Sequence, residues 1–509
     1  MNKKKQILAV GIVLLVAALI RLYNLAKESF WKDEALTVLT SSQSNITDLI
    51  KNLVLIHQNH PPLYFLLLHY WGNIFGFSEF SMRFISVIFS LGIVFMVYLL
   101  SKEIFENKTA IIAMLLSALS ITNLIYSQEA KQYSMLGFFV LLSTYFLVRF
   151  LKSAKKKQRQ KFLTLYFISS ILMFYTHHIG LIVFFLQNLF LILFERKNFL
   201  SKRTIIWELI CFVLYLPLIL LIIWAFSNGQ HDVISLMLAR NFPLFIAKLG
   251  YLNLLWVVVF FILLSLVFYL NFRSTKKLVN SYKNFENIIN KRKNSILNAC
   301  LFLIVVLYAL GSVIIGTKFL HPYFITKYPF FIFAFVHILL ARLIVLVFKR
   351  KFVFISLAVI LLINIALIMN FYSANIKSEW RDATEIIREN IKNNDFIVYP
   401  GGDNIAPFLY YFPAKPFNYS DIPYDIYSYF SMTKFTEKEL RAPEIQNPEA
   451  FELIKEKMKE KNGGIWVVHY YRYQLREPFD EFAQKNLKLQ YENNFEEDNR
   501  LIIQYYTLN

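Results

Sequence analysis

Long apolar runs, separated by short loops that contain Lys and Arg, dominate the first 371 residues of the chain. A membrane-spanning helix needs about 20 apolar residues to cross roughly 30 Å of hydrocarbon. Runs of this length predict a mostly α, polytopic membrane protein with about 11 transmembrane helices. They begin near Ile7, Phe80, Thr109, Ser134, Phe162, Ile179, Thr204, Phe245, Ile296, Tyr323 and Phe352. Because only 17% of the chain is charged, against about 25% in soluble domains, a cytosolic enzyme and a disordered chain are excluded.

The charged residues divide the chain into two parts. Residues 1–371 contain 37 basic and 12 acidic side chains, whereas residues 377–509 contain 17 basic and 22 acidic ones. We therefore expect a transmembrane domain over 1–371, with a long first loop over 24–79, and a soluble domain over 372–509. Helical and strand patterns alternate in the second part, which predicts a C-terminal α/β domain. Helices are expected over 379–390 and 448–461, and strands over 396–399, 465–471 and 501–506.

The basic residues also predict the orientation in the membrane. Residues 61–75 are apolar, but the segment is short and starts with two prolines, so we interpret it as an interfacial helix. With that choice, alternate loops on one side hold 25 of the 37 basic residues. The positive-inside rule then places the first loop, residues 127–133 and the C-terminal domain on the extracytoplasmic side. The first apolar run is read as a retained anchor that ends near Arg21.

Acidic residues gather in two of these outer loops. Asp33 and Glu34 lie in the first loop, flanked by Phe30, Trp31 and Ala35. A carboxylate in such partly dry surroundings can act as a general base. The pair is therefore a candidate for catalysis.

The second outer loop and its neighbours offer further polar side chains. Glu129, Lys131 and Tyr133 lie in this loop, between two apolar runs. Arg83 lies just inside the second run, where an arginine is expected to meet an anion such as a phosphate or a carboxylate. His60 precedes the two prolines. We expect His60 and Arg83 to border a polar pocket between Asp33 and the second outer loop.

Two adjacent histidines, His177 and His178, occur at the outer end of the fifth run. No spacing of His, Asp or Glu indicates a strong metal site, and none is assigned. The basic runs are short inner loops already explained by the insertion rule, so no nucleic-acid partner is expected.

Four strings carry a family resemblance. They are residues 30–35 (FWKDEA), 59–64 (NHPPLY), 78–83 (SEFSMR) and 126–131 (YSQEAK). They occur in the order seen in glycosyltransferase family 39 of the GT-C superfamily. Over roughly residues 1–340 the chain resembles bacterial relatives of the dolichyl-phosphate-mannose protein mannosyltransferases and of the lipid A aminoarabinose transferase.

The resemblance implies an enzyme that moves a sugar from a polyprenyl-phosphate carrier to a lipid, glycan or protein acceptor on the outer face, with inversion. It implies Asp33 as the catalytic residue. It implies that Glu129 helps to build the site; in some relatives the acid at this position contacts a metal, so a divalent cation is a candidate cofactor. His177 and His178 match a Tyr-x-His element at the equivalent helix end.

Two positions depart from the family pattern. Tyr64 and Phe65 stand where many mannosyltransferases have a glycine and a lysine, so no lysine contact to the donor comes from there. Pro322 precedes Tyr323 where an arginine is expected, and Lys318 or Lys327 is the alternative cation.

The chemistry assigns a role to each candidate. A polyprenyl-phosphate sugar is already activated, so the protein must orient the acceptor, accept its proton and neutralise the departing phosphate. We assign the proton to Asp33, support of the site to Glu34 and Glu129, and the phosphate to Arg83 and Lys131. The further substrate-binding candidates are His60, Tyr133, His177, His178, Tyr323 and Lys327.

Other classes of protein stay open at this point. A transporter or flippase of lipid-linked sugars is the main alternative, although such proteins use helices interrupted by Gly and Pro. The chain has only 14 Gly and 14 Pro, and its acids lie in loops. A polymerase or ligase of surface polysaccharide, and a relative that only binds lipid-linked sugars, are further alternatives.

Overall fold

The chain forms two compact units in a computed structural model. The structure describes residues 2–55, 60–194, 199–227, 328–347, 350–374, 377, 379–399, 405–412, 426–428, 449–470, 476–495 and 501–509. The helical unit comprises residues 1–23, 58–64 and 83–371, and the sheet unit comprises residues 24–57, 65–82 and 372–509. Most of the first loop thus groups with the C-terminal residues.

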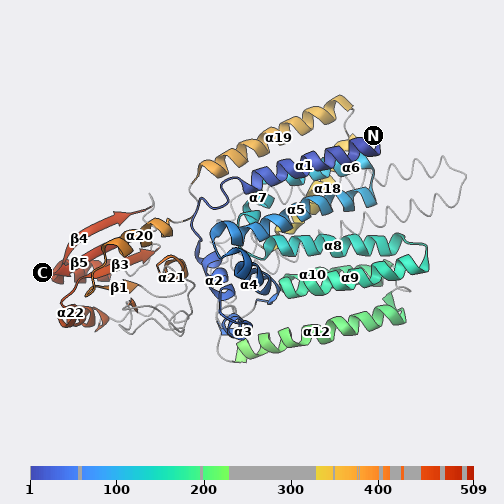
Figure 1. Ribbon diagram of the computed structural model, residues 1–509. Coiled ribbons are helices and arrows are strands. Elements are labelled where there is room, and N and C mark those ends of the chain that lie inside the picture. Colours follow the sequence, from blue (N-terminus) through green and yellow to red (C-terminus); the bar gives the residue numbers. More distant parts are fainter. Residues whose placement is uncertain are drawn as a thin grey trace, which may run out of the picture. The chain divides into compact units, whose positions relative to one another are not determined.

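Long apolar helices build the helical unit. In Figure 1, α8, α9 and α10 run side by side, as their short connections and mutual contacts require. The elements are α1 (Lys3–Leu22), α5 (Glu79–Ile104), α6 (Asn107–Ala118), α7 (Ile121–Ser127), α8 (Tyr133–Lys152), α9 (Lys156–Thr176), α10 (Ile179–Phe194), α12 (Lys202–Ser227), η1 (Tyr328–Phe331), α18 (Ile332–Val347) and α19 (Arg350–Ser373).

Several of these helices can cross a membrane. Among the described residues, five are long and apolar enough, namely α1, α5, α8, α12 and α19, or up to six if α6 and α7 together count as one span. α10 and α18 are apolar but shorter. The expected runs near Phe245 and Ile296 lie outside the described residues. The predicted mostly helical, multi-pass class is confirmed.

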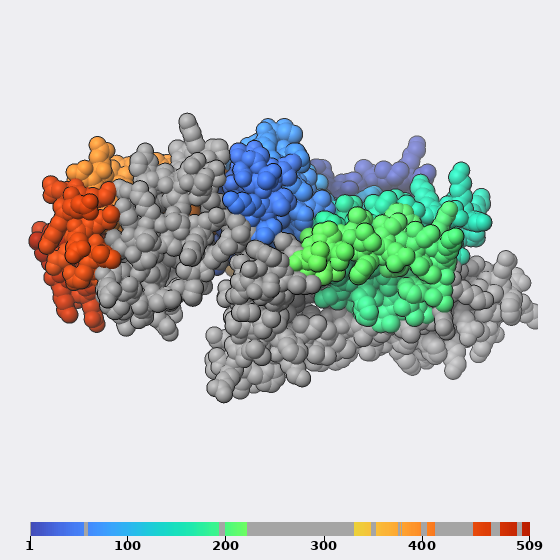
Figure 2. Space-filling view, turned by 90° about the horizontal axis from the view of Figure 1, so that it is seen from below, coloured from blue at the N-terminus to red at the C-terminus, as the bar shows by residue number. Residues whose placement is uncertain are grey.

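The surface of α12 has the character of a lipid-facing helix. Large apolar side chains are exposed along it, including those of Leu209, Phe212 and Val213. Figure 2 shows this helix in green at the surface of the molecule. In water such a continuous apolar face would be unfavourable, whereas hydrocarbon solvates it.

The apolar run that begins at Thr109 is bent rather than straight. It forms α6 and α7, which meet at an angle of 54°. Ser120 begins α7, and its Oγ accepts a hydrogen bond from the backbone N–H of Asn123 at 3.4 Å. The Asn123 side chain in turn donates to the carbonyl of Ser117 at 3.2 Å, so polar side chains pair backbone groups around the bend.

Arg21, near the end of α1, is fully buried beside this bend. Its Nη1 donates to the carbonyl of Ala118, the last residue of α6, at 2.9 Å, and its Nε donates to Ser90 Oγ at 2.8 Å. A cation at a helix C-terminus pairs the free carbonyls and opposes the negative end of the helix dipole. Arg21 therefore joins α1, α5 and α6 as well as ending the first apolar run.

We expect Arg21→Met to destabilise the helical unit by about 3 kcal/mol, because buried hydrogen bonds to a charged group are lost and their acceptors remain buried. Thermal unfolding of the purified protein in detergent measures the change. Arg203→Met is the matched control, because Arg203 is exposed at the start of α12. Equal midpoints for the two variants would contradict the structural role of Arg21.

A mixed sheet forms the centre of the sheet unit. The strand order is β2-β1-β3-β5-β4; β1 pairs in parallel with β2 and β3, whereas β5 pairs antiparallel with β3 and β4. The strands are β1 (Phe396–Tyr399), β2 (Ile426–Ser428), β3 (Ile465–Tyr470), β4 (Leu487–Asn494) and β5 (Leu501–Leu508). The helices are α2 (Lys32–Ser41), α3 (Ile46–Leu55), α4 (Leu63–Phe75, which starts in the helical unit), α20 (Trp380–Asn390), α21 (Ala406–Tyr411), α22 (Glu449–Lys461) and α23 (Arg476–Asn486).

Apolar side chains of the central strands and two helices form the core of this unit. Val398 and Val467 pack with Met458 of α22 and Phe479 of α23, and all four are fully buried. The three strands expected from the sequence are present, and β2 and β4 are additional. β4 is an edge strand with mostly exposed polar side chains, which protects the sheet from pairing with another chain.

The interfacial helix expected over residues 61–75 corresponds to α4. Its 13 residues extend about 20 Å at 1.5 Å per residue, which is too short to cross a bilayer. A buried contact within the sheet unit holds it: Nδ1 of His69 lies 2.9 Å from the carbonyl oxygen of Ser41, at the end of α2.

Candidate functional site

The two acids of the first loop lie in the first turn of α2. Trp31 precedes the helix in an extended conformation, and Asp33 and Glu34 follow, where the helix dipole stabilises negative charge. Their environments differ: Glu34 is fully buried, whereas Asp33 is only partly buried. Adjacent residues of a helix point about 100° apart, so the two carboxylates face different surroundings.

Glu34 has a cationic partner from far along the chain. Its Oε2 lies 2.8 Å from Nζ of Lys377, and the same oxygen accepts the backbone N–H of Trp31 at 3.4 Å. The bond to Trp31 closes the first turn of α2 in the manner of a capping box. Lys377 also donates its backbone N–H to Oε1 of Glu28, at 3.3 Å.

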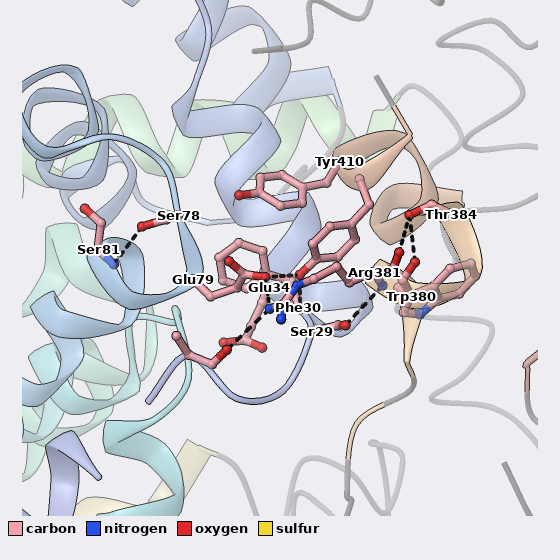
Figure 3. Close-up of polar contacts among 12 residues, drawn as sticks. Ser29, Phe30, Glu34, Ser78, Glu79, Ser81, Trp380, Arg381, Thr384 and Tyr410 are labelled. Carbon is pink, nitrogen blue, oxygen red and sulfur yellow. Dashed lines mark hydrogen bonds and ion pairs between the residues drawn. The ribbon is translucent and has the colours of Figure 1, made fainter. Parts of the chain in front are cut away.

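A second ion pair fixes the chain just before α2. Oε1 of Glu79 accepts hydrogen bonds from Nη2 of Arg381 at 2.5 Å and from the Tyr411 hydroxyl at 2.8 Å. The Tyr411 oxygen accepts the backbone N–H of Phe30 at 2.7 Å, and the backbone N–H of Arg381 donates to Ser29 Oγ at 3.2 Å. Figure 3 shows this network around Glu79.

Tyr411 is a hydrogen-bond donor over the whole physiological pH range. Burial raises the pKa of its phenol well above the ordinary value, and the negative charge of Glu79 acts in the same direction. The neutral hydroxyl can therefore donate to Glu79 while it accepts from Phe30.

The candidates of the second loop are found in the helical unit, between α7 and α8. Glu129 is partly buried, and Lys131 and Tyr133 are buried. The carbonyl of Lys131 accepts a hydrogen bond from Ser86 Oγ at 3.2 Å, and Ser86 lies 3.1 Å from the hydroxyl of Tyr64. These bonds fix the turn against α5 and α4.

Three histidines of the helical unit form a neighbouring group. The rings of His60 and His177 are 5.9 Å apart, and Nδ1 of His178 lies 2.6 Å from the hydroxyl of Tyr215. Burial lowers the pKa of His177 well below its ordinary value, and His60, His178 and Lys131 act in the same direction. His177 is therefore neutral near pH 7, and its Nδ1 accepts the backbone N–H of Ile179 at 3.1 Å.

The remaining candidates fall in different places. Arg83 is buried in the second turn of α5. Tyr323 and Lys327 lie outside the described residues. No group of three or more His, Cys, Asp or Glu side chains that could hold a metal ion occurs in the described part of the chain.

The structure adds residues that sequence reasoning did not select. Lys377 and Tyr411 belong to no recognisable motif, and only their contacts with Glu34, Glu79 and Phe30 draw attention to them. Glu79 lies in the string 78–83 noted above, but its ion pair with Arg381 could not be inferred, since the two residues are 302 positions apart.

The fold is similar to that of solved membrane proteins. ArnT from Cupriavidus metallidurans in the apo state has a TM-score of 0.53 and 12% identity, with 97% of each chain covered. The same protein bound to undecaprenyl phosphate has a TM-score of 0.52 and 12% identity, with 99% of this chain and 98% of that chain covered. An oligosaccharyltransferase from Archaeoglobus fulgidus, tethered with an acceptor peptide, has a TM-score of 0.52 and 13% identity, with 92% of this chain and 69% of that chain covered.

These similarities define the class as membrane proteins of the GT-C fold, as the sequence predicts. Residues 59–224 match the family described as dolichyl-phosphate-mannose-protein mannosyltransferase, and no curated protein sequence matches the chain. That segment contains three of the four strings noted above and is similar to this family of membrane glycosyltransferases. The family resemblance and the enzyme class are thus confirmed.

We expect Tyr411→Phe to loosen the chain around Phe30, because the hydrogen bonds of the hydroxyl to Glu79 and from Phe30 are lost, a loss of about 2 kcal/mol. Faster hydrogen exchange over residues 26–34 and a lower unfolding temperature report the change. Tyr410→Phe is the adjacent control, since its hydroxyl donates to the carbonyl of Phe77 at 2.8 Å. The role of Tyr411 is contradicted if both variants exchange at the wild-type rate.

Proposed function

We propose that the protein transfers a sugar from a polyprenyl-phosphate-linked donor to an acceptor on the extracytoplasmic face of the membrane, with inversion of the anomeric centre. The family match over residues 59–224 carries this proposal. The structure of ArnT with undecaprenyl phosphate supports a polyprenyl-phosphate donor. The acceptor is a lipid, a glycan or a protein.

Asp33 is the proposed general base. Its neighbour Glu34 is buried and paired with Lys377, which leaves the partly buried Asp33 as the better placed of the two to receive a proton. The acceptor hydroxyl oxygen bonds to the anomeric carbon while the bond from that carbon to the phosphate oxygen breaks. The hydroxyl proton passes to the Asp33 carboxylate, and polyprenyl phosphate leaves with the bonding electrons.

Cations of the helical unit are proposed to stabilise the leaving phosphate. Arg83 and Lys131 are buried, and a buried cation interacts more strongly with an anion than a solvated one does. His60 and Lys327 are the reserve cations. Glu129, Tyr133, His177, His178 and Tyr323 are the proposed walls of the substrate site, and Glu129 is the residue at which a divalent cation would bind.

We expect Asp33→Asn to reduce sugar transfer by about 100-fold to 10,000-fold, the usual effect of removing a general base. The variant should still insert into the membrane, because an amide of the same shape replaces the carboxylate. Transfer is measured as loss of sugar from the donor by mass spectrometry. Asp48→Asn, at a partly exposed acid of α3 in the same unit, serves as the control. Near-normal turnover by Asp33→Asn would remove Asp33 from the mechanism.

We expect Lys131→Met to lower kcat/KM for the donor by about 100-fold, since one charge that stabilises the departing phosphate is lost. Lys131→Arg should keep a larger part of the activity because it keeps the charge. Lys108→Met removes an exposed lysine at the start of α6 and should have no effect. An unchanged kcat/KM for Lys131→Met, in a protein that elutes as a single folded species, would contradict the assignment.

A panel of polyprenyl-phosphate sugars tests the function as a whole. Purified protein is incubated with hexose and pentose donors and a cell-envelope fraction that contains native acceptors, and loss of each sugar is followed. Turnover of at least one donor supports the proposal. Movement of intact donor across reconstituted vesicles without turnover would favour the transporter or flippase.

A further inference from the structure

We propose that Lys377 is a positioning residue for the transfer reaction: by pairing with the buried Glu34 it holds the first turn of α2, and with it Asp33, in the geometry that catalysis requires. This role rests on the proposed function of Asp33. It concerns a residue outside the family match, which ends at position 224.

The ion pair of Glu34 and Lys377 is buried. The Glu34 side chain has no exposed surface, and the Lys377 side chain is only 13% exposed. A carboxylate removed from water is strongly destabilised unless a cation and hydrogen-bond donors replace its solvation. The contact of 2.8 Å with Lys377 supplies the charge, and the N–H of Trp31 supplies a further donor.

The ion pair and the start of α2 share an atom. Oε2 of Glu34 accepts hydrogen bonds both from Lys377 and from the backbone N–H of Trp31, the residue that precedes α2. Lys377 also contacts Glu28 through its backbone N–H. Lys377 therefore contacts the chain at Glu28 and Glu34, which are six positions apart and lie on either side of Asp33.

The neighbouring ion pair of Glu79 and Arg381 is more exposed than that of Glu34 and Lys377, since the Arg381 side chain is 43% exposed. Partly solvated ion pairs contribute little free energy, whereas breaking a buried pair leaves an uncompensated charge. Loss of Lys377 should thus disturb the start of α2 more than loss of Arg381 does.

The rate of transfer depends on the position of the base. A donor with a good leaving group needs an accurately placed base, and a displacement of that base by about 1 Å can reduce the rate by about 100-fold. Loss of Lys377 removes the cation that lies 2.8 Å from the buried Glu34 carboxylate, and the first turn of α2 is expected to move so that water replaces the lost charge. Asp33 is the adjacent residue of that turn, so its carboxylate would move as well.

Lys377→Met tests the role. We expect kcat to fall by about 10-fold to 100-fold while KM for a polyprenyl-phosphate sugar changes by less than about twofold. Lys377→Arg should retain most of the rate, because it preserves the charge. The double variant Glu34→Gln with Lys377→Met should be faster than Lys377→Met alone, because it also removes the buried negative charge that Lys377 balances.

Lys392→Met is the matched control, as it removes an exposed lysine of the same unit. Thermal unfolding in detergent is measured for every variant, and the rates are compared among variants with wild-type midpoints. If Lys377→Met does not fold, the comparison of Lys377→Arg and the double variant with wild type decides. A wild-type rate for Lys377→Met, or a double variant as slow as the single one, would overturn the positioning role.

Asp33→Asn distinguishes the two proposals. An inactive Asp33→Asn with a fully active Lys377→Met would overturn the role of Lys377 alone. An active Asp33→Asn would overturn the assignment of the base, whatever the behaviour of Lys377.

Discussion

The ion pair between Glu34 and Lys377 is the contact on which the arrangement of the sheet unit depends. A fully buried carboxylate is unfavourable by itself, so the fold of the first loop and the position of the residue 343 places later require each other. Closing so long a loop is entropically unfavourable before the contact forms. The first loop can therefore reach its final structure only when the segment after α19 is present.

The same dependence recurs elsewhere in less extreme form. Tyr411 links Phe30 to Glu79, and Arg381 links Glu79 to Ser29, so these anchors of the segment before α2 come from other parts of the sheet unit. In the helical unit Arg21 has an equivalent function at the bend between α6 and α7. In both units buried polar groups are paired across segments that are distant in sequence, which gives one specific structure rather than a loose assembly of apolar helices.

The parts of this structure that follow from local pattern could be predicted, and those that depend on distant partners could not. Apolar runs and strand periodicity predicted the long helices and β1, β3 and β5. The bend at Leu119 and Ser120 was missed, because no proline or glycine marks it and its carbonyls are paired by side chains from elsewhere. β4 was missed because polar side chains make up most of its sequence, as suits an edge strand.

The candidate site shows the same limit at the level of single residues. The sequence identified Asp33 and Glu34 as a pair with one environment, but a helix turns them about 100° apart, and Glu34 is the more deeply buried of the two and pairs with Lys377. A paired, buried carboxylate is poorly suited to accept a proton, because its negative charge is already used to balance the lysine. Two adjacent acids in one turn can thus have separate functions: in the proposed mechanism Glu34 fixes the backbone, and Asp33 accepts the proton. A reaction whose donor is already activated needs little more from the protein than such placement, which is why a structural ion pair can control its rate.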